Sequence, residues 1–118
     1  MSLITVILAT LVALEHFYIM YLETFATHSD STGRVFNMTK EERQRPSVTN
    51  LFKNQGVYNG LIAVFLLYGL FISHNTEVVT LFLINVVAAA AYGAVTADKK
   101  IILTQGGLAI LALISLLF

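Results

Sequence analysis

The sequence predicts an all-α integral membrane protein, a bundle of four transmembrane helices that forms a single domain over residues 1–118. Only 12% of the residues are charged and 57% are hydrophobic, whereas soluble domains usually carry about 25% charged residues. A soluble globule of this length has too much surface to hide so much apolar material. Four stretches are also long and apolar enough to cross about 30 Å of hydrocarbon, which takes roughly 20 residues.

The predicted membrane helices cover about residues 3–25, 55–73, 78–96 and 101–118. We expect the first to be retained rather than removed as a signal peptide, because no basic residue precedes it and no small-residue cleavage site follows it. Short segments, 74–77 and 97–100, join the later helices as tight antiparallel hairpins. The long connection is a loop of about residues 26–54.

Basic residues are confined to two of the three connections. All seven Lys and Arg residues lie in the loops 26–54 and 97–100, and none lies in the remaining loop or at either end. Lys and Arg in short loops keep those loops on the cytoplasmic side. We therefore expect a multi-pass protein of the plasma membrane with these two loops in the cytoplasm and both termini outside.

The long loop carries local helix signals. Thr39 followed by Glu42 matches a capping box and predicts a short helix, which Pro46 should end. After Pro46, a narrow apolar stripe that includes Leu51 and Phe52 has two interpretations. It either lies on the membrane surface and runs into the second helix, or belongs to a solvated connector.

Small residues recur at four-residue spacing in two predicted helices. Gly56 and Gly60 form a GxxxG pattern, and Ala89, Gly93 and Ala97 continue the same spacing in the next helix. Such spacing lets helix backbones approach closely in lipid, where no hydrophobic driving force brings helices together. These residues predict close helix packing and do not indicate a particular chemistry.

Three ionisable residues in the second half of the first helix are the candidate catalytic residues: Glu15, His16 and Glu23. An ionisable group inside a membrane span costs about 2.5–3.5 kcal/mol, so it normally faces the protein interior or a water-filled cavity. His16 and Glu23 project in almost the same direction on a helix, and Glu15 lies within about 100° of them. A carboxyl in such surroundings can handle protons with a nearby histidine.

The other helices supply the polar side chains that we expect to bind a ligand. These are Tyr18, Gln55, Tyr58, Asn59, Asn85, Tyr92 and Gln105. Most of them lie in the cytoplasmic halves of the predicted helices, whereas the outer halves are nearly free of polar groups. The sequence therefore predicts a polar pocket, open to the cytoplasmic side, that binds a small polar or lipid-like molecule and, in the enzymatic interpretation, transforms it by acid/base chemistry.

Two other functions stay open at this stage. A proton-coupled small-molecule transporter working as a dimer is one, because a glutamate in the first of four helices is similar to the small multidrug exporters. The long first loop departs from that family, and no outward path is visible. The other is a structural role, in which a buried polar network holds the helices in register.

The composition also bears on cofactors and partners. Cysteine is absent and the formal net charge is zero, so we expect no thiolate chemistry and no nucleic-acid partner. Glu15 and His16 are adjacent and cannot both point at one ion from a regular helix, so no metal and no other cofactor is predicted. The expected partners are membrane lipids, a small polar or amphiphilic ligand and further copies of the chain, because four helices make a thin wall.

Three motifs resemble a known family. They are residues 15–19 with Glu23, residues 54–60 (Asn-Gln-Gly-Val-Tyr-Asn-Gly), and the Gln105-Gly106 pair that opens the last predicted helix. On these motifs the chain resembles the small bacterial four-helix membrane proteins known as domain of unknown function 1304. The resemblance covers essentially the whole chain and implies four membrane helices with no established activity. It also suggests that the polar residues chosen above are motif positions of that family.

Overall fold

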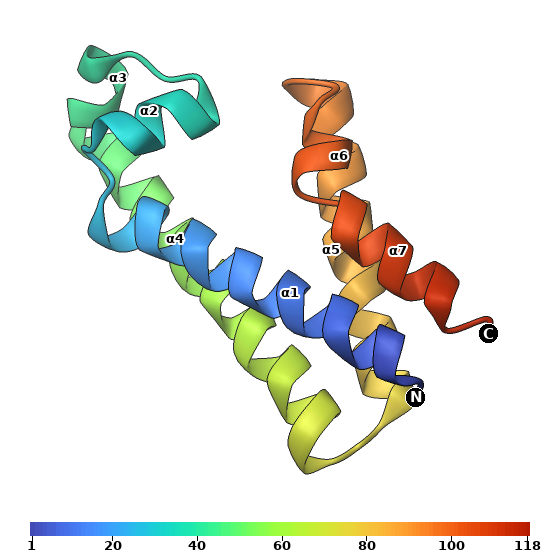
Figure 1. Cartoon of the computed structure of the whole chain (residues 1–118). Helices are drawn as coiled ribbons and strands as arrows, with labels where there is room; N and C mark the ends of the chain where they lie inside the picture. Colours follow the sequence, from blue (N-terminus) through green and yellow to red (C-terminus); the bar gives the residue numbers. More distant parts are fainter. The chain divides into compact units, whose positions relative to one another are not determined.

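The computed structural model describes residues 1–118, which are almost entirely helical and contain no strand. The chain divides into two compact units, one of residues 16–63 and the other of residues 1–15 with 64–118. In chain order (Figure 1) the helices are α1 (Leu3–Met20), the π-helix η1 (Tyr21–Phe25), α2 (Asp30–Phe36), α3 (Lys40–Gln44), α4 (Pro46–Leu67), the π-helix η2 (Tyr68–Ile72), α5 (Thr76–Thr96), α6 (Ile101–Thr104) and α7 (Gly107–Ser115).

Three continuous helices are long and apolar enough to cross a membrane. They are Leu3–Phe25 with 23 residues, Pro46–Ile72 with 27 and Thr76–Thr96 with 21. At 1.5 Å per residue each exceeds the roughly 30 Å thickness of the hydrocarbon layer. At most 33% of the most apolar stretch of each helix is buried. Soluble proteins rarely expose so much contiguous apolar surface, so these helices indicate a membrane protein.

The fourth predicted helix, 101–118, is not continuous. It is divided into α6 and the nine-residue α7 by a turn at Gln105 and Gly106. Glycine in a helix interior costs about 1 kcal/mol relative to alanine, and two adjacent glycines make an interruption inexpensive. A Cβ on Gly106 would lie 3.1 Å from the Cβ of Ala90. The missing side chain thus lets the turn pack closely on α5. Neither α6 nor α7 is long enough to cross a membrane alone.

The second predicted helix begins earlier than expected. Its predicted start was about residue 55, but α4 starts at Pro46 and is continuous from there. Proline suits the first turn of a helix because its missing N–H has no partner there anyway. The apolar stripe after Pro46 is therefore part of the same helix and runs into the second predicted span. Its position on a membrane surface stays a prediction. Phe52 on this stripe contacts Phe36 of α2 edge to face, with ring centroids 5.3 Å apart.

Two local predictions are confirmed. The capping box forms at α3, where the Glu42 amide donates to Thr39 Oγ1 (3.1 Å) and the Thr39 amide donates to Glu42 Oε1 (3.0 Å). The hydrogen bond that the Thr39 amide donates to the Glu42 carboxylate lowers the pKa of Glu42 from its ordinary value. The third predicted helix, 78–96, corresponds to α5, whose N-cap Asn75 accepts a hydrogen bond from the Val78 amide at 3.1 Å.

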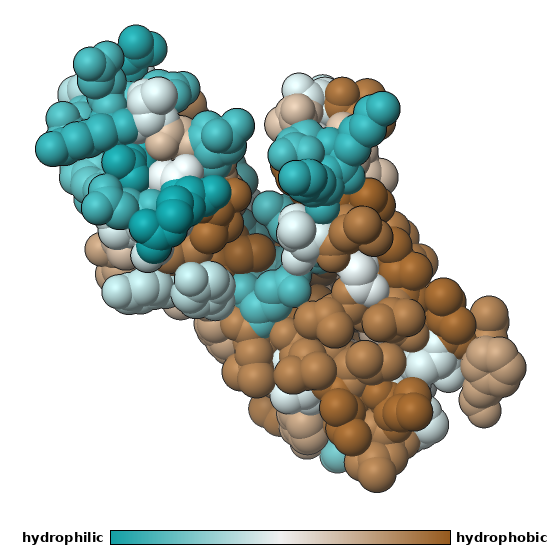
Figure 2. All heavy atoms as spheres, turned by 45° about the horizontal axis from the view of Figure 1, so that its top comes forward, coloured by the Kyte–Doolittle hydropathy of each residue, from teal (hydrophilic) through white to brown (hydrophobic).

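The unit 16–63 is held together by polar contacts to backbone carbonyls. The Thr32 hydroxyl is fully buried and lies 3.0 Å from the carbonyl of Leu22 and 2.7 Å from that of Ala26, which joins α2 to η1. Arg43 of α3 is also buried and donates from Nη1 to the Ser29 carbonyl at 2.6 Å. Hydrophilic side chains cover the outside of α2 and α3 (Figure 2). These contacts fix the turn between η1 and α2.

The unit of residues 1–15 and 64–118 has an apolar core of small and medium side chains. In it α5 packs against η2, α6 and α7. Its buried residues include Val79, Leu83 and Val86 on α5 and Ala109 and Ala112 on α7. A buried contact of 2.7 Å between the hydroxyls of Thr5 and Ser115 joins the start of α1 to α7.

Candidate functional site

Glu23 is the most deeply buried of the ionisable residues chosen from the sequence. It lies in η1, the single π-helical turn that ends the first apolar helix, and its exposed fraction is 0%. Single π-helical turns are rare and frequently occur at functional sites. A Cβ on Gly56 of α4 would lie 3.1 Å from the Cβ of Glu23, and one on Gly60 would lie 3.2 Å from Cγ of Met20. The predicted GxxxG pattern is thus the place where α4 approaches the end of α1 and η1.

Asn59 of α4 is the hydrogen-bond partner of Glu23. Its side-chain amide donates from Nδ2 to Glu23 Oε1 at 2.6 Å. The second carboxylate oxygen, Oε2, is buried and has no hydrogen-bond partner in the chain. Buried polar atoms are nearly always paired, and an exception requires an explanation. Glu23 Oε2 can take up a proton or accept a hydrogen bond from a ligand.

The other predicted residues of the unit 16–63 are distributed differently. His16 is buried, with an exposed fraction of 4%, on the same helix as Glu23. Tyr18 and Tyr58 are 54% and 65% exposed, and Gln55 is exposed as well. Of the three predicted α4 side chains, Asn59 is therefore the one that the structure places on the Glu23 carboxyl.

Four predicted residues belong to the unit of residues 1–15 and 64–118. Glu15 has one buried carboxylate oxygen, Oε1, without a hydrogen-bond partner. Asn85 and Tyr92 lie on α5 and are exposed, and Gln105 is half-buried in the turn between α6 and α7. The roles expected for these residues remain predictions. No group of three or more His, Asp or Glu residues lies close enough together to hold a metal ion.

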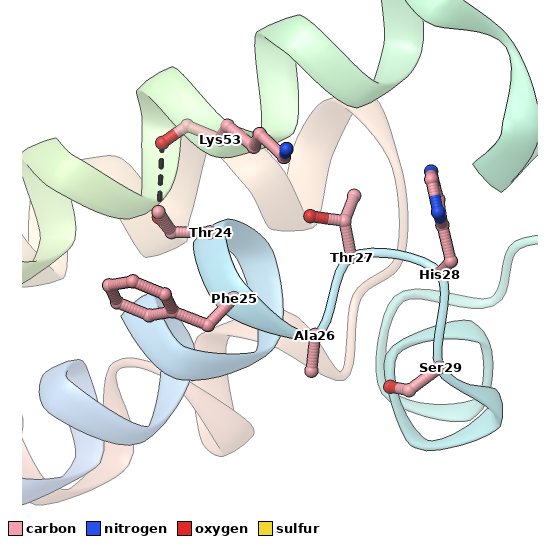
Figure 3. Close-up of a pocket in the computed structure, with 7 residues that line it drawn as sticks. All are labelled: Thr24, Phe25, Ala26, Thr27, His28, Ser29 and Lys53. Atoms are coloured by element: carbon pink, nitrogen blue, oxygen red, sulfur yellow. Dashed lines mark hydrogen bonds between the residues drawn. The ribbon is translucent and has the colours of Figure 1, made fainter.

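A polar hollow next to Glu23 in the chain was not predicted from the sequence. It has a volume of about 310 Å³, and Figure 3 shows its wall, which consists of Thr24, Phe25, Ala26, Thr27, His28, Ser29 and Lys53. None of the predicted site residues lines it. The signal for this hollow in the sequence was a run of hydroxyl residues with a histidine directly after an apolar span. Such a run is also typical of a solvated loop. Only the structure shows that Lys53 of α4 forms part of the same wall.

The fold and this site define a class: a small helical protein with three membrane-length apolar helices and a buried glutamate at the end of the first. The chain belongs to the family described as "Protein of unknown function (DUF1304)", which matches residues 10–117. The resemblance seen in the sequence motifs is thereby confirmed.

One relative matches over its whole length. The chain is 63% identical over 119 residues to "Uncharacterized protein YpaA" of Lactococcus lactis subsp. lactis (strain IL1403), with 100% of each chain covered. No solved structure matches the chain.

Proposed function

We propose that this protein is a multi-pass plasma-membrane protein that binds a small polar or lipid-like molecule through the carboxyl of Glu23. The observation that carries the proposal is the state of that carboxyl, with Oε1 held by Asn59 and Oε2 buried without a partner. A carboxyl that only joined two helices would be expected to have both oxygens satisfied. The free oxygen favours a ligand that offers an N–H or O–H donor.

The same carboxyl is suited to proton transfer. In its neutral form Glu23 can donate a proton from Oε2, and in its charged form it can accept one, while Asn59 keeps the group oriented through Oε1. Acid/base chemistry on the bound molecule, with His16 and Glu15 as the further proton-handling groups, is the enzymatic form of the proposal. The side chains of Tyr18, Gln55 and Tyr58 are exposed and would contact the ligand on entry.

The proposed topology places Glu23 near the cytoplasmic surface. The charge distribution puts the loops 26–54 and 97–100 in the cytoplasm, because they hold all the Lys and Arg residues. With both termini outside, the interrupted segment 101–118 makes the fourth crossing, and its turn at Gln105 lies within the membrane. Irregular backbone at that depth has to be shielded by protein. We therefore expect a four-helix bundle that forms one domain and associates with further copies and with lipids.

A transporter working as a dimer is the second candidate, and the free Oε2 of Glu23 favours it as well. A buried carboxyl that binds either a proton or a substrate exchanges one for the other, which is the basis of proton-coupled transport. A purely structural role requires only the Glu23–Asn59 hydrogen bond. These functions differ in what happens when the carboxyl is replaced by an amide of the same shape.

Native mass spectrometry of the full chain, released gently from its membrane, tests the proposal with Glu23→Gln. We expect the wild type to retain a small molecule and Glu23→Gln to lose it, because the amide removes both the charge and the transferable proton. Glu77→Gln is the matched control, since Glu77 is exposed in the first turn of α5, and it should retain the same mass.

Each function predicts a different outcome. A molecule retained equally by wild type and Glu23→Gln would contradict the proposed site. An empty protein whose unfolding midpoint falls in Glu23→Gln would support the structural role. Flux of a substrate into proteoliposomes that stops in Glu23→Gln would favour the transporter.

A further inference from the structure

The hollow after the first span has a wall rich in hydrogen-bonding groups. The Thr24 hydroxyl donates to the carbonyl of Lys53 at 3.0 Å, and this bond holds α4 against the end of η1. In Figure 3 the side chains of Thr27 and His28 project from the turn toward α4, from which Lys53 extends. His28 Nε2 lies 3.0 Å from the hydroxyl of Thr49, which holds the imidazole in place. The hollow is therefore shaped by specific contacts.

The charge of the wall has one sign. Lys53 contributes an ammonium and His28 an imidazole, whereas no carboxylate lines the hollow. Two carboxyls flank the wall in the sequence, and neither is part of it: that of Glu23 is paired with Asn59 on α4, and that of Asp30 lies 3.6 Å from Arg43 Nη2. A hollow bordered by an ammonium and an imidazole, with no acid in its wall, attracts anions.

Two backbone amides add to the donors. In the turn, the amide of Ala26 donates to Tyr21 and that of Ser29 donates to Ala26. The amides of Thr27 and His28 donate to no other group of the chain, although both residues belong to the wall. Successive free amides in a turn are a recurring way of binding anions, and phosphate in particular.

The position in the chain favours the same ligand. The hollow begins at Thr24 and Phe25, the last residues of the first membrane-length helix. Tyr21, in the last turn of that helix, is 54% exposed, and an exposed tyrosine ring at the end of a span is typical of the boundary between hydrocarbon and headgroups. At that depth the phosphate of a lipid headgroup is the most abundant anionic group.

We propose that the hollow formed by residues 24–29 and Lys53 binds a phosphate group, carried by an anionic lipid headgroup or by a soluble phosphate. Lys53 supplies the charge, and the amides of Thr27 and His28 supply directed hydrogen bonds. This inference goes beyond the proposed Glu23 site, which lies outside the hollow.

Amide hydrogen exchange in residues 26–29 of the full chain in non-ionic detergent tests the inference. The probes are dioctanoyl phosphatidylglycerol, inorganic phosphate and, as the phosphate-free control, dioctanoylglycerol. We expect phosphatidylglycerol to slow exchange of the Thr27 and His28 amides. Lys53→Gln should weaken this binding about ten-fold or more, because a charge-assisted hydrogen bond is lost. Lys40 of α3 lies outside the hollow, so Lys40→Gln is the matched control and should bind phosphatidylglycerol as the wild type does.

The outcomes separate the two sources. Protection by phosphatidylglycerol alone assigns the site to a lipid headgroup, and protection by inorganic phosphate as well assigns it to phosphate from either source. Protection by neither, equal protection by dioctanoylglycerol, or equal weakening in Lys53→Gln and Lys40→Gln would overturn the inference. The readout is amide protection rather than a retained mass, so this site and the Glu23 site can fail separately.

Discussion

Replacing Gly56 with leucine is expected to destabilise the unit 16–63 strongly. A Cβ added at this position would lie 3.1 Å from the Cβ atoms of both Thr24 and Glu23, so a larger side chain must push α4 away from η1. The displacement would break the Glu23–Asn59 bond and the bond from Thr24 to the carbonyl of Lys53. Overpacking costs about 1–3 kcal/mol and each lost hydrogen bond about 1 kcal/mol. The measurement is the unfolding midpoint, together with the fraction of monodisperse protein.

Gly107→Leu is the matched control for this substitution. A Cβ on Gly107 meets no atom within 4 Å, so leucine there should leave the unfolding midpoint close to that of the wild type. Gly56→Ala should fall between the wild type and Gly56→Leu. Equal effects of leucine at positions 56 and 107 would show that α4 does not pack against η1 in this way.

The second large effect is expected for Arg43→Met. The guanidinium of Arg43 is buried, donates to the Ser29 carbonyl at 2.6 Å and lies 3.6 Å from Asp30. Methionine retains much of the apolar contact but leaves the carbonyl without its charged donor, at a cost of about 1.5–3 kcal/mol. Hydrogen exchange in α2 and α3 should accelerate accordingly, because these short helices depend on the contact.

Two controls separate the backbone contact from the ion pair. Asp30 is 89% exposed, and exposed ion pairs contribute about 0–1 kcal/mol, so Asp30→Asn should change exchange in α2 little. Arg34→Met removes an exposed arginine from α2 itself and should also have a small effect. If Asp30→Asn accelerates exchange as much as Arg43→Met does, the ion pair rather than the carbonyl contact stabilises this part of the chain.

The sequence predicts the long helices well because their signals are local. Apolar runs of membrane length locate the spans at 3–25 and 78–96, and Thr39 with Glu42 locates α3 by its capping box. The two glycines at 106 and 107 and Pro46 are local signals as well, but each allows more than one outcome. In the structure the turn at Gly106 lies close to Ala90, and the start of α4 is accompanied by the packing of Phe52 against Phe36. Contacts between distant residues are not visible in a one-dimensional pattern.

The site was predictable to a smaller extent. The cost of a carboxylate in an apolar helix singles out Glu23, and Asn59 is selected as a polar residue of the second predicted helix. The sequence could not distinguish Asn59 from its exposed neighbour Tyr58, because which of the two contacts Glu23 depends on how α4 packs against η1. Arg43 was missed because arginines in a polar loop are usually solvated. Its burial requires the absence of a side chain at Gly33, where a Cβ would lie 2.7 Å from Arg43 Cζ.

The proposed function depends on the chain crossing the membrane between residue 34 and residue 76, with residue 34 in the cytoplasm. The chain contains no cysteine, so Arg34→Cys and Thr76→Cys each give a single labelling site at an exposed position. The deciding measurement is modification by a membrane-impermeant maleimide in intact and in permeabilised cells. We expect Thr76→Cys to be labelled in intact cells and Arg34→Cys to be labelled only after permeabilisation. Labelling of Arg34→Cys in intact cells, or of both positions from the same side, would contradict this account.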